Sequence, residues 1–291
     1  MNIKNFIYRS KIISDKIDNL SNDVVKSNST LTNISKSIEE DKKYKEILNN
    51  DLVNLSNNLH KIKNELSRVS LEKNINEFEK RCYSQDGEDV VLAAFYETKP
   101  DFRGFYVDIG AFHPFRFSNT QYFYEKGWRG INVDATPGSM NEFDEFRSGD
   151  VNVEIGVSTD GKDLTFYCFE EGALNSFDKK ISEKRVKQGW KMIGEKKVKT
   201  MSVNSLLEKY LPKNQKIDFI NIDIEGLELG VLKSLDWNKY KPDFLLIEEL
   251  TLVDKDIVKF GDTDMYGFLN GLGYGIVART KRTLIFKNAR K

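Results

Sequence analysis

Apolar residues in the first 80 positions recur at alternating steps of three and four, the spacing of a coiled-coil seam. The seam consists of Ile3, Phe6, Ile13, Ile17, Leu20, Val24, Leu31, Ile34, Ile38, Leu48, Leu52, Leu55, Leu59, Ile62, Leu66 and Val69. Neither Gly nor Pro, the residues that most disfavour a helix interior, occurs before Gly87. The pattern therefore predicts a long helical coiled coil over residues 1–80. As a single rod it would be roughly 100 Å long.

We expect this helix to associate with further copies of the chain through residues 3–69, because an apolar seam of this length is otherwise exposed to water. Two other interpretations stay open. The segment could be one amphipathic helix folded back on the rest of the chain. Asp41 and Lys45, which occupy seam positions, could fix the register or mark a bend between two helical pieces. The pattern does not determine the number of chains.

From residue 81 onward, short apolar strands alternate with amphipathic helices. The pattern predicts strands at 105–110, 129–135, 151–158, 217–223 and 244–249, and helices near 118–127, 137–147, 203–211, 226–235 and 265–272. A turn at Asp160-Gly161 leads into 164–169, which we expect to form a hairpin extension. Segments 274–280 and 283–287 predict an antiparallel hairpin. Residues 81–291 are thus predicted to form an α/β domain, a doubly wound parallel sheet with an antiparallel edge.

Acidic residues end several of these otherwise apolar strands. They are Asp108, Asp134, Asp223, Glu225, Glu248 and Glu249. Ligands of such sheets bind outside the carboxyl ends of the strands. A buried carboxylate is also costly unless it is hydrogen-bonded, paired or bound to a metal. This edge of the sheet is therefore the predicted functional site.

The first two strand ends indicate a nucleoside ligand. A carboxylate at the position of Asp134 can accept hydrogen bonds from both hydroxyls of a ribose. The turn after the first strand reads DIGAFHP, so Phe112, His113 and Pro114 stand where a pyrophosphate-binding turn carries further glycines. That argues against NAD or FAD and favours a nucleoside without phosphates, of which S-adenosylmethionine is the common one.

Several blocks resemble the FkbM-type methyltransferases. They are YSQDGED at 83–89, FYVDIGAFHP at 105–114, SNT at 118–120, GWRGINVDATP at 127–137, LNSF at 174–177 and IDFINIDIEGLELGVLKSLDW at 217–237. The resemblance runs from about residue 83 to 249. It implies a class I methyltransferase (Rossmann-like) fold, S-adenosylmethionine as cofactor and an oxygen acceptor such as a sugar. It also implies cofactor binding by Asp108, Gly110, Ala111 and Asp134, with Gln85, Ala135 and Ser158 completing the predicted set.

Methylation of a sugar hydroxyl requires a base, or a metal that lowers the pKa of the hydroxyl. His113 and Asp223 are the candidate bases, although His113 could equally shape its turn. Asp223, Glu248 and Glu249 are candidate oxygen ligands for Mg²⁺ or Mn²⁺. Adjacent residues of a strand point to opposite faces, which counts against using both glutamates. We expect Glu225 to face the first turn of the following helix.

The composition of the chain limits the kinds of partner and compartment that we expect. The 45 basic and 45 acidic residues balance, which argues against a protein that coats nucleic acid. Cys82 and Cys168 form no pattern typical of a disulfide framework or zinc site. No apolar run approaches the roughly 20 residues of a membrane span, so we expect a cytoplasmic protein without membrane association. Residues 178–200 hold nine Lys or Arg and form either a solvated face or a lid for a substrate diphosphate.

The sequence and its resemblance together predict an S-adenosylmethionine-dependent O-methyltransferase acting on a sugar hydroxyl, in a nucleotide-activated sugar or a surface-glycan precursor. The Asn-, Lys- and Ile-rich composition is typical of an AT-rich bacterial source, in which capsule or polysaccharide biosynthesis is a natural setting. The alternative is a non-catalytic coiled-coil scaffold with a nucleoside-binding domain. A dehydrogenase is opposed by the glycine pattern.

Overall fold

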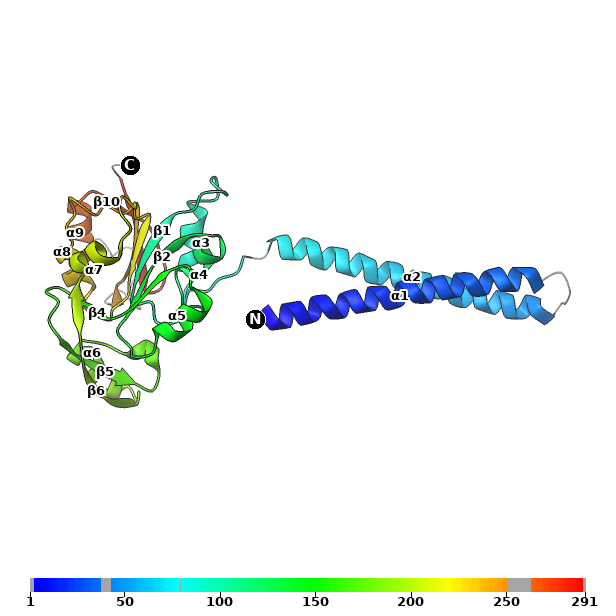
Figure 1. Ribbon diagram of the computed structural model, residues 1–291, viewed down its shortest axis with the longest axis horizontal. Helices are drawn as coiled ribbons and strands as arrows, with labels where there is room; N and C mark the ends of the chain where they lie inside the picture. The colour runs from blue at the N-terminus through cyan, green and yellow to red at the C-terminus, as the bar shows by residue number, and fades with distance from the viewer. Residues whose placement is uncertain (1–2, 38–42, 79, 251–262, 290–291) are drawn as a thin grey trace. The chain divides into compact units, whose positions relative to one another are not determined.

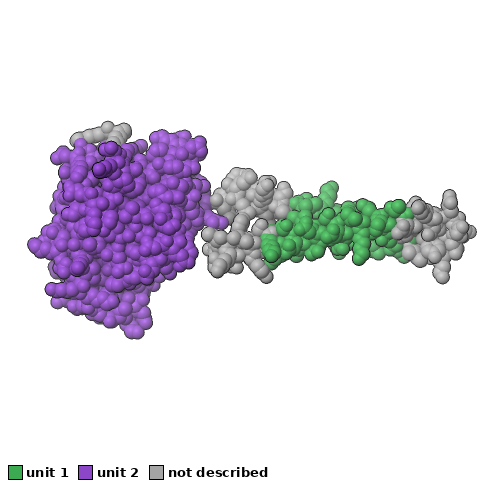
Figure 2. Space-filling model, viewed as in Figure 1, with its two compact units in different colours: residues 1–79 green, residues 80–291 purple. Residues whose placement is uncertain are grey.

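The computed structural model describes residues 3–37, 43–78, 80–250 and 263–289. The chain divides into two compact units, Met1–Glu79 and Lys80–Lys291 (Figure 2). The predicted boundary was 80/81. Within the described residues, no helix has the length and apolarity that crossing a membrane requires. Each unit is described by itself.

The first unit consists of α1 (Ile3–Ser37) and α2 (Lys43–Phe78), which lie side by side (Figure 1). The prediction of one long rod is therefore wrong, and the alternative of two helical pieces holds. The two helices pack on each other because their seams give each an apolar stripe. Asp41, one of the two residues proposed to interrupt the seam, lies outside the described residues.

The helix pair covers only part of its own seam. Leu20, Val24 and Leu31 of α1 are half-buried, as are Leu55 and Ile62 of α2. A heptad-spaced stripe on α2, formed by Leu52, Leu59 and Leu66, is 46%, 52% and 57% exposed. Among the side chains described in this unit (11–32, 48 and 50–67), none is fully buried. The first unit therefore presents an apolar stripe that its own two helices leave uncovered.

The second unit is built on a seven-stranded sheet within the described residues, in the order β10-β11-β9-β8-β1-β2-β3. Its strands are β1 (Phe105–Ile109), β2 (Arg129–Asp134), β3 (Val151–Glu154), β8 (Phe219–Ile222), β9 (Phe244–Glu248), β10 (Tyr274–Arg279) and β11 (Thr283–Asn288). Neighbouring strands from β3 to β9 pair in parallel, whereas β11 is antiparallel to both β9 and β10. The predicted parallel strands and the antiparallel C-terminal hairpin are thus present. The carboxyl ends of β1, β2, β8 and β9 meet at one edge.

Helices cover both faces of the sheet (Figure 1). They are α3 (Glu88–Ala94), α4 (Gln121–Glu125), α5 (Met140–Phe146), α7 (Val203–Tyr210), α8 (Glu228–Ser234) and α9 (Asp264–Gly271). Val107 of β1 shares one apolar cluster with Leu206 of α7. Tyr106, the preceding residue, shares another with Leu92 of α3 and Phe123 of α4. Alternate residues of β1 thus face opposite layers, which explains why the strand is apolar on both sides.

The predicted third strand is divided in two. The Ile155 N–H still donates to the Asp134 carbonyl at 2.9 Å, but the next N–H, of Gly156, donates to the Lys199 carbonyl at 3.1 Å. The chain therefore leaves the main sheet at Ile155, and β4 (Gly156–Ser158) pairs in parallel with β7 (Thr200–Ser202). No feature of the sequence pattern marked this change of partner.

The expected hairpin extension pairs with a different segment. Strand β5 (Leu164–Phe169) is antiparallel to β6 (Met192–Val198), not to 151–158. Six of the seven β6 residues are exposed, so the strand lacks the apolar alternation by which strands are predicted. The basic segment between them also contains α6 (Lys179–Lys187). The 178–200 insertion is therefore a helix followed by a strand.

A buried arginine ties the sheet edge to the helices beside it. The Arg147 side chain is fully buried and its guanidinium lies 3.0 Å from the Asp150 carboxylate. It also donates to the Thr120 hydroxyl at 2.9 Å, and that hydroxyl donates to Asp108 at 2.7 Å. A buried charge needs a partner and full hydrogen bonding. Arg147 therefore balances the charge of Asp150, and through the Thr120 hydroxyl it helps to hold the Asp108 carboxylate in position.

Arg147→Met should lower the free energy of unfolding by about 3–5 kcal/mol, because it leaves the Asp150 carboxylate buried without its partner. Urea denaturation followed by tryptophan fluorescence reports on this unit alone, since Trp128, Trp190 and Trp237 all lie in it. The control Arg103→Met removes an exposed arginine that reaches only backbone carbonyls, and should change stability by at most about 0.5 kcal/mol. Equal losses in the two variants would contradict this account.

Candidate functional site

A cavity of about 430 Å³ opens at the carboxyl edge of the sheet. That volume suits a small-molecule ligand. The predicted site residues that line it are Gln85, Asp108, Gly110, Ala111, Asp134, Ala135, Asp223 and Glu248. His113, Ser158 and Glu249 do not line it. Most of the residues selected as strand ends are thus brought together around one cavity.

The turn after β1 is wedged between two neighbouring strands. The N–H groups of Gly110 and Ala111 donate to the Val133 carbonyl at 2.9 and 3.0 Å. Gly110 has φ +86°, and a Cβ on it would lie 1.7 Å from the backbone oxygen of Asp223. Only glycine fits both the left-handed conformation and this close approach. The backbone therefore forms the cavity floor at this point.

Asp134 stands beside this turn at the end of β2. Its carboxylate accepts hydrogen bonds from the Phe112 N–H at 3.0 Å and the Thr136 N–H at 2.7 Å. Burial raises the pKa of Asp134, and these backbone donors oppose the rise. The carboxylate is thus held in place at the cavity wall, with lone pairs left for a further donor such as a ribose hydroxyl.

The Asp108 carboxylate is hydrogen-bonded by polar side chains for which the sequence predicted no role. Its carboxylate accepts from the Thr120 hydroxyl and, at 2.9 Å, from the Asn221 amide, which in turn accepts from Asn119. Burial raises the pKa of Asp108, opposed by these hydrogen bonds and by the charge of Arg147. A signal for Asn221 was present in the sequence: it is a polar residue inside the apolar strand IDFINID.

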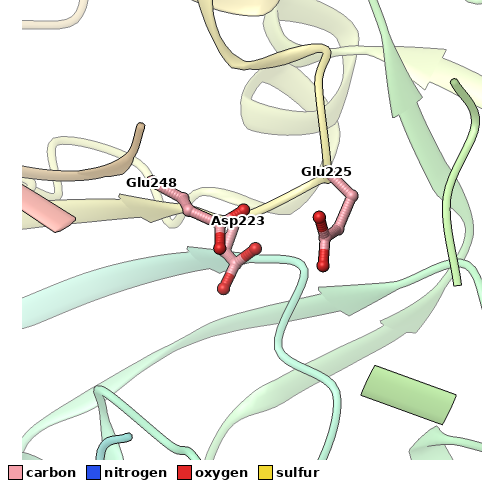
Figure 3. Close-up of side chains that lie close together, drawn as sticks. All are labelled: Asp223, Glu225 and Glu248. Atoms are coloured by element: carbon pink, nitrogen blue, oxygen red, sulfur yellow. The ribbon is translucent and has the colours of Figure 1, made fainter. Parts of the chain in front are cut away.

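Three carboxylates gather at the ends of β8 and β9. Asp223, Glu225 and Glu248 each contribute one oxygen to a group whose members lie within 4.8 Å of one another. Figure 3 shows Asp223 and Glu248 close together, with the Glu225 carboxylate beside them. Burial, followed by the charge of Glu225, raises the pKa of Asp223 to about 8. Burial and the charge of Asp223 likewise raise the pKa of Glu248 well above its usual value.

Glu225 takes the place that was predicted for Glu249. Its carboxylate accepts from Arg185 of α6 at 2.5 Å. Glu225 was expected to face the start of the helix that follows β8. Glu228 takes that position instead, and its carboxylate accepts from the N–H groups of Ile224 and Gly226 at 3.0 Å. Burial raises the pKa of Glu228 to about 7. Glu249 lies outside the group because β9 ends at Glu248 and successive side chains point apart.

His113 has the turn-shaping role that was its alternative interpretation. Its Nδ1 accepts from the N–H groups of Phe115 and Arg116, both at 3.0 Å. Its Nε2 lies 3.0 Å from the Glu142 carboxylate. With both ring nitrogens engaged and the side chain away from the cavity wall, His113 is not placed to take a proton there.

Ser158 is also engaged elsewhere. Its hydroxyl is 2.6 Å from that of Thr200 and accepts from the Gly161 N–H at 2.9 Å. The departure of the chain from the main sheet at Ile155 carries it into the β4–β7 pair. Ile155 and Val157 line the cavity in its place.

The segment at 83–89 is anchored to the C-terminal hairpin. Asp86 pairs with Arg282 at 2.7 Å, and Glu88 accepts from the Thr280 hydroxyl. Asp89 accepts from the Tyr83 N–H at 2.7 Å. These contacts hold the intervening Gln85 at the cavity wall.

The basic insertion contributes little charge to the cavity. Within the fully described segment 178–200, Arg185 and Trp190 line the cavity, whereas the lysines do not. Arg185 is buried and already paired with Glu225, and Trp190 is 49% exposed. The lysines therefore form a solvated face, and the lid for a diphosphate gains no support from their positions.

Residues 108–276 match the family described as "Methyltransferase FkbM domain". The chain belongs to the FkbM methyltransferase family. The match covers more than half of the chain and includes the strand ends from Asp108 to Glu248, while the helical first unit and the cavity residues Gln85 and Arg282 lie outside it. The carboxylates described above are therefore part of a methyltransferase domain.

Among solved structures, the chain is similar to "Methyltransferase FkbM from Methylobacillus flagellatus KT". The two share 14% identity with a TM-score of 0.37, and the alignment covers 64% of this chain and 44% of that one. The chain thus spans less than half the length of this neighbour, and the likeness carries no further argument. A comparison with curated proteins finds no match.

Gly110→Ala should destabilise the domain by about 2–5 kcal/mol, because left-handed φ costs about 1–2 kcal/mol and the overlap about 1–3 kcal/mol. Gly189→Ala is the matched control: it has φ +94° but nothing within 4 Å of an added Cβ, so it should cost only the about 1–2 kcal/mol of backbone strain. Urea midpoints of the two variants give the comparison. Equal destabilisation would mean that β1 and β8 do not approach this closely at Gly110.

Proposed function

We propose that the chain is an S-adenosylmethionine-dependent O-methyltransferase that acts on a sugar hydroxyl, in a nucleotide-activated sugar or a surface-glycan precursor. One observation carries the proposal. A single cavity in an FkbM methyltransferase domain is lined both by Gly110 and Asp134, where a nucleoside could bind, and by the buried or half-buried acid group that includes Asp223. The methyl donor and the methyl acceptor would therefore bind next to each other in one cavity.

The cofactor half of the cavity matches a nucleoside. The bare backbone at Gly110 would admit a ligand closely, and the Asp134 carboxylate has the lone pairs to accept from a ribose diol. Ile155, Val157 and Phe166 add apolar wall on which a purine ring could pack. The many carboxylates also favour a cationic sulfonium over the neutral product that remains after methyl transfer.

The acceptor half supplies the proton acceptor. The hydroxyl oxygen attacks the sulfonium methyl carbon, the carbon–sulfur bond breaks with its electron pair going to sulfur, and the hydroxyl proton passes to the Asp223 carboxylate. The products are a methyl ether and S-adenosylhomocysteine. The methyl group is already activated, so catalysis mainly requires its alignment with the hydroxyl oxygen. A positioned base is needed in addition to remove the hydroxyl proton. Asp223 takes the role because it lines the cavity and His113 does not.

Asp134→Asn should weaken S-adenosylmethionine binding about 10- to 100-fold, since a hydrogen bond to a charged group contributes about 1.5–3 kcal/mol. The control is Glu154→Gln, which alters the carboxylate paired with Asp134 in strand register but exposed to solvent. It should leave the affinity within about twofold. Calorimetry with S-adenosylmethionine, S-adenosylhomocysteine and NAD measures these affinities.

The same preparation, incubated with nucleotide-sugars and glycan precursors, should form S-adenosylhomocysteine. Absence of binding to both S-adenosyl compounds would overturn the proposal. Binding without turnover on any acceptor would favour the non-catalytic scaffold that binds a nucleoside.

We also propose that the first unit assembles the protein into homo-oligomers. The stripe of Leu52, Leu59 and Leu66 is apolar, heptad-spaced and about half exposed. No described side chain of the unit is fully buried, so the helix pair alone gains little from the hydrophobic effect. A second copy offers the same stripe, and pairing of the two would bury both.

Replacing Leu52, Leu59 and Leu66 together with Lys should convert the oligomer to monomers, because three charges would enter the shared apolar seam. The matched control places the same charges at Asn50, Asn57 and Asn64, which are exposed and have the same heptad spacing. It should leave the oligomer intact. Light scattering coupled to size exclusion measures the mass; a monomeric unaltered chain would refute the assembly.

A further inference from the structure

The acid group of Asp223, Glu225 and Glu248 carries more negative charge than its surroundings compensate. Arg185 pairs with Glu225 at 2.5 Å and supplies one positive charge. With all three carboxylates ionised, two negative charges are left over. A divalent cation carries the charge that would balance them.

The neighbouring charged groups are already engaged. Arg282 pairs with Asp86 at 2.7 Å. Glu228 accepts from backbone N–H groups of its own loop. Asp108 accepts from Thr120 and Asn221. The charge of Arg282 reaches Glu225 at a distance, but the ion pair with Asp86 already balances that charge.

A second observation points to a missing ligand. Glu248 is only 7% exposed, and its Oε2 is buried with no hydrogen-bond partner among the described residues. Its carboxylate is directed at Asp223 (Figure 3). A buried carboxylate oxygen without a donor, beside a second carboxylate, is costly unless a cation or a shared proton lies between them.

We propose that Asp223, Glu225 and Glu248 bind a hard divalent cation, Mg²⁺ or Mn²⁺. An all-oxygen, carboxylate-rich group is the donor set these ions prefer. Opposite ligands of an octahedral Mg²⁺ stand about 4.1 Å apart, and the three oxygens here lie within 4.8 Å of one another. Binding of an ion would draw the three oxygens closer together. Arg185 fixes one oxygen of Glu225 and leaves the other for the ion.

Three protein ligands leave coordination positions open toward the cavity. Resting on the proposed function, we assign those positions to two neighbouring hydroxyl oxygens of the sugar acceptor. Chelation would hold the reacting oxygen in place and lower its pKa, so that it loses its proton more readily. Asp223 would bind the ion through one carboxylate oxygen and take the hydroxyl proton on the other. The substrate class is thereby narrowed to acceptors with a vicinal diol.

The test is calorimetric titration of the full chain, stripped with EDTA, with MnCl₂ or MgCl₂ and without cofactor. We expect one ion per chain. Glu248→Gln keeps the side-chain shape and should weaken Mn²⁺ binding at least tenfold. Glu249→Gln changes the adjacent residue, outside the acid group, and should change the affinity less than twofold. The decrease of the electron paramagnetic resonance signal of free Mn²⁺ gives an independent count of bound ions.

Absence of Mn²⁺ and Mg²⁺ binding up to millimolar concentration would overturn the inference, as would equal affinity in unaltered chain and Glu248→Gln. Titration with S-adenosylmethionine in parallel separates the two proposals. Cofactor binding without metal binding refutes the cation site and leaves the methyltransferase proposal standing. For the acceptor, an isolated monohydroxyl sugar analogue methylated as fast as its vicinal diol counterpart would refute the chelating role.

Discussion

The carboxyl edge of the sheet depends on one constraint: several carboxylates are held there away from water, and each needs compensation. Two of them obtain it from the protein. Asp108 is served by Thr120 and Asn221, and Asp134 by the backbone N–H groups of Phe112 and Thr136. Asp223 and Glu248 have no comparable donors among the described residues, and the pKa of each is raised by burial and by a neighbouring carboxylate. Asp108 and Asp134 are thus held in place by the protein itself, whereas Asp223 and Glu248 require a positively charged or proton-carrying ligand.

Much of this edge could be predicted, because a charged residue at the end of an apolar strand is conspicuous. The strands that contain Asp108, Asp134 and Glu248, and strand β8 directly before Asp223, have the apolar pattern and the burial expected of them. Parallel pairing then brings their ends together whatever the rest of the chain does. The Gly110 turn was predictable for a related reason, since glycine directly after a first strand permits close approach.

What escaped prediction depends on long-range partners. After Ile155 the chain changes sheet, because the Gly156 N–H donates to the Lys199 carbonyl. Strand β6 pairs with β5 although its residues are almost all exposed. Glu225 rather than Glu249 joins the acids because Arg185, 40 positions earlier in the chain, draws it into place. The division of the N-terminal helix was an alternative that heptad spacing alone could not decide, since both arrangements satisfy the same seam.

We regard the Gly110–Asp134 edge and the acid group as two halves of one methyl-transfer site. A crystal structure of the chain with S-adenosylhomocysteine and MnCl₂ tests it most directly. We expect the ribose hydroxyls within about 2.5–3.0 Å of the Asp134 carboxylate, the sulfur directed toward Asp223, and an anomalous manganese peak beside the Glu248 carboxylate. A nucleoside bound elsewhere, or bound there with its sulfur directed away from the acids, would contradict it.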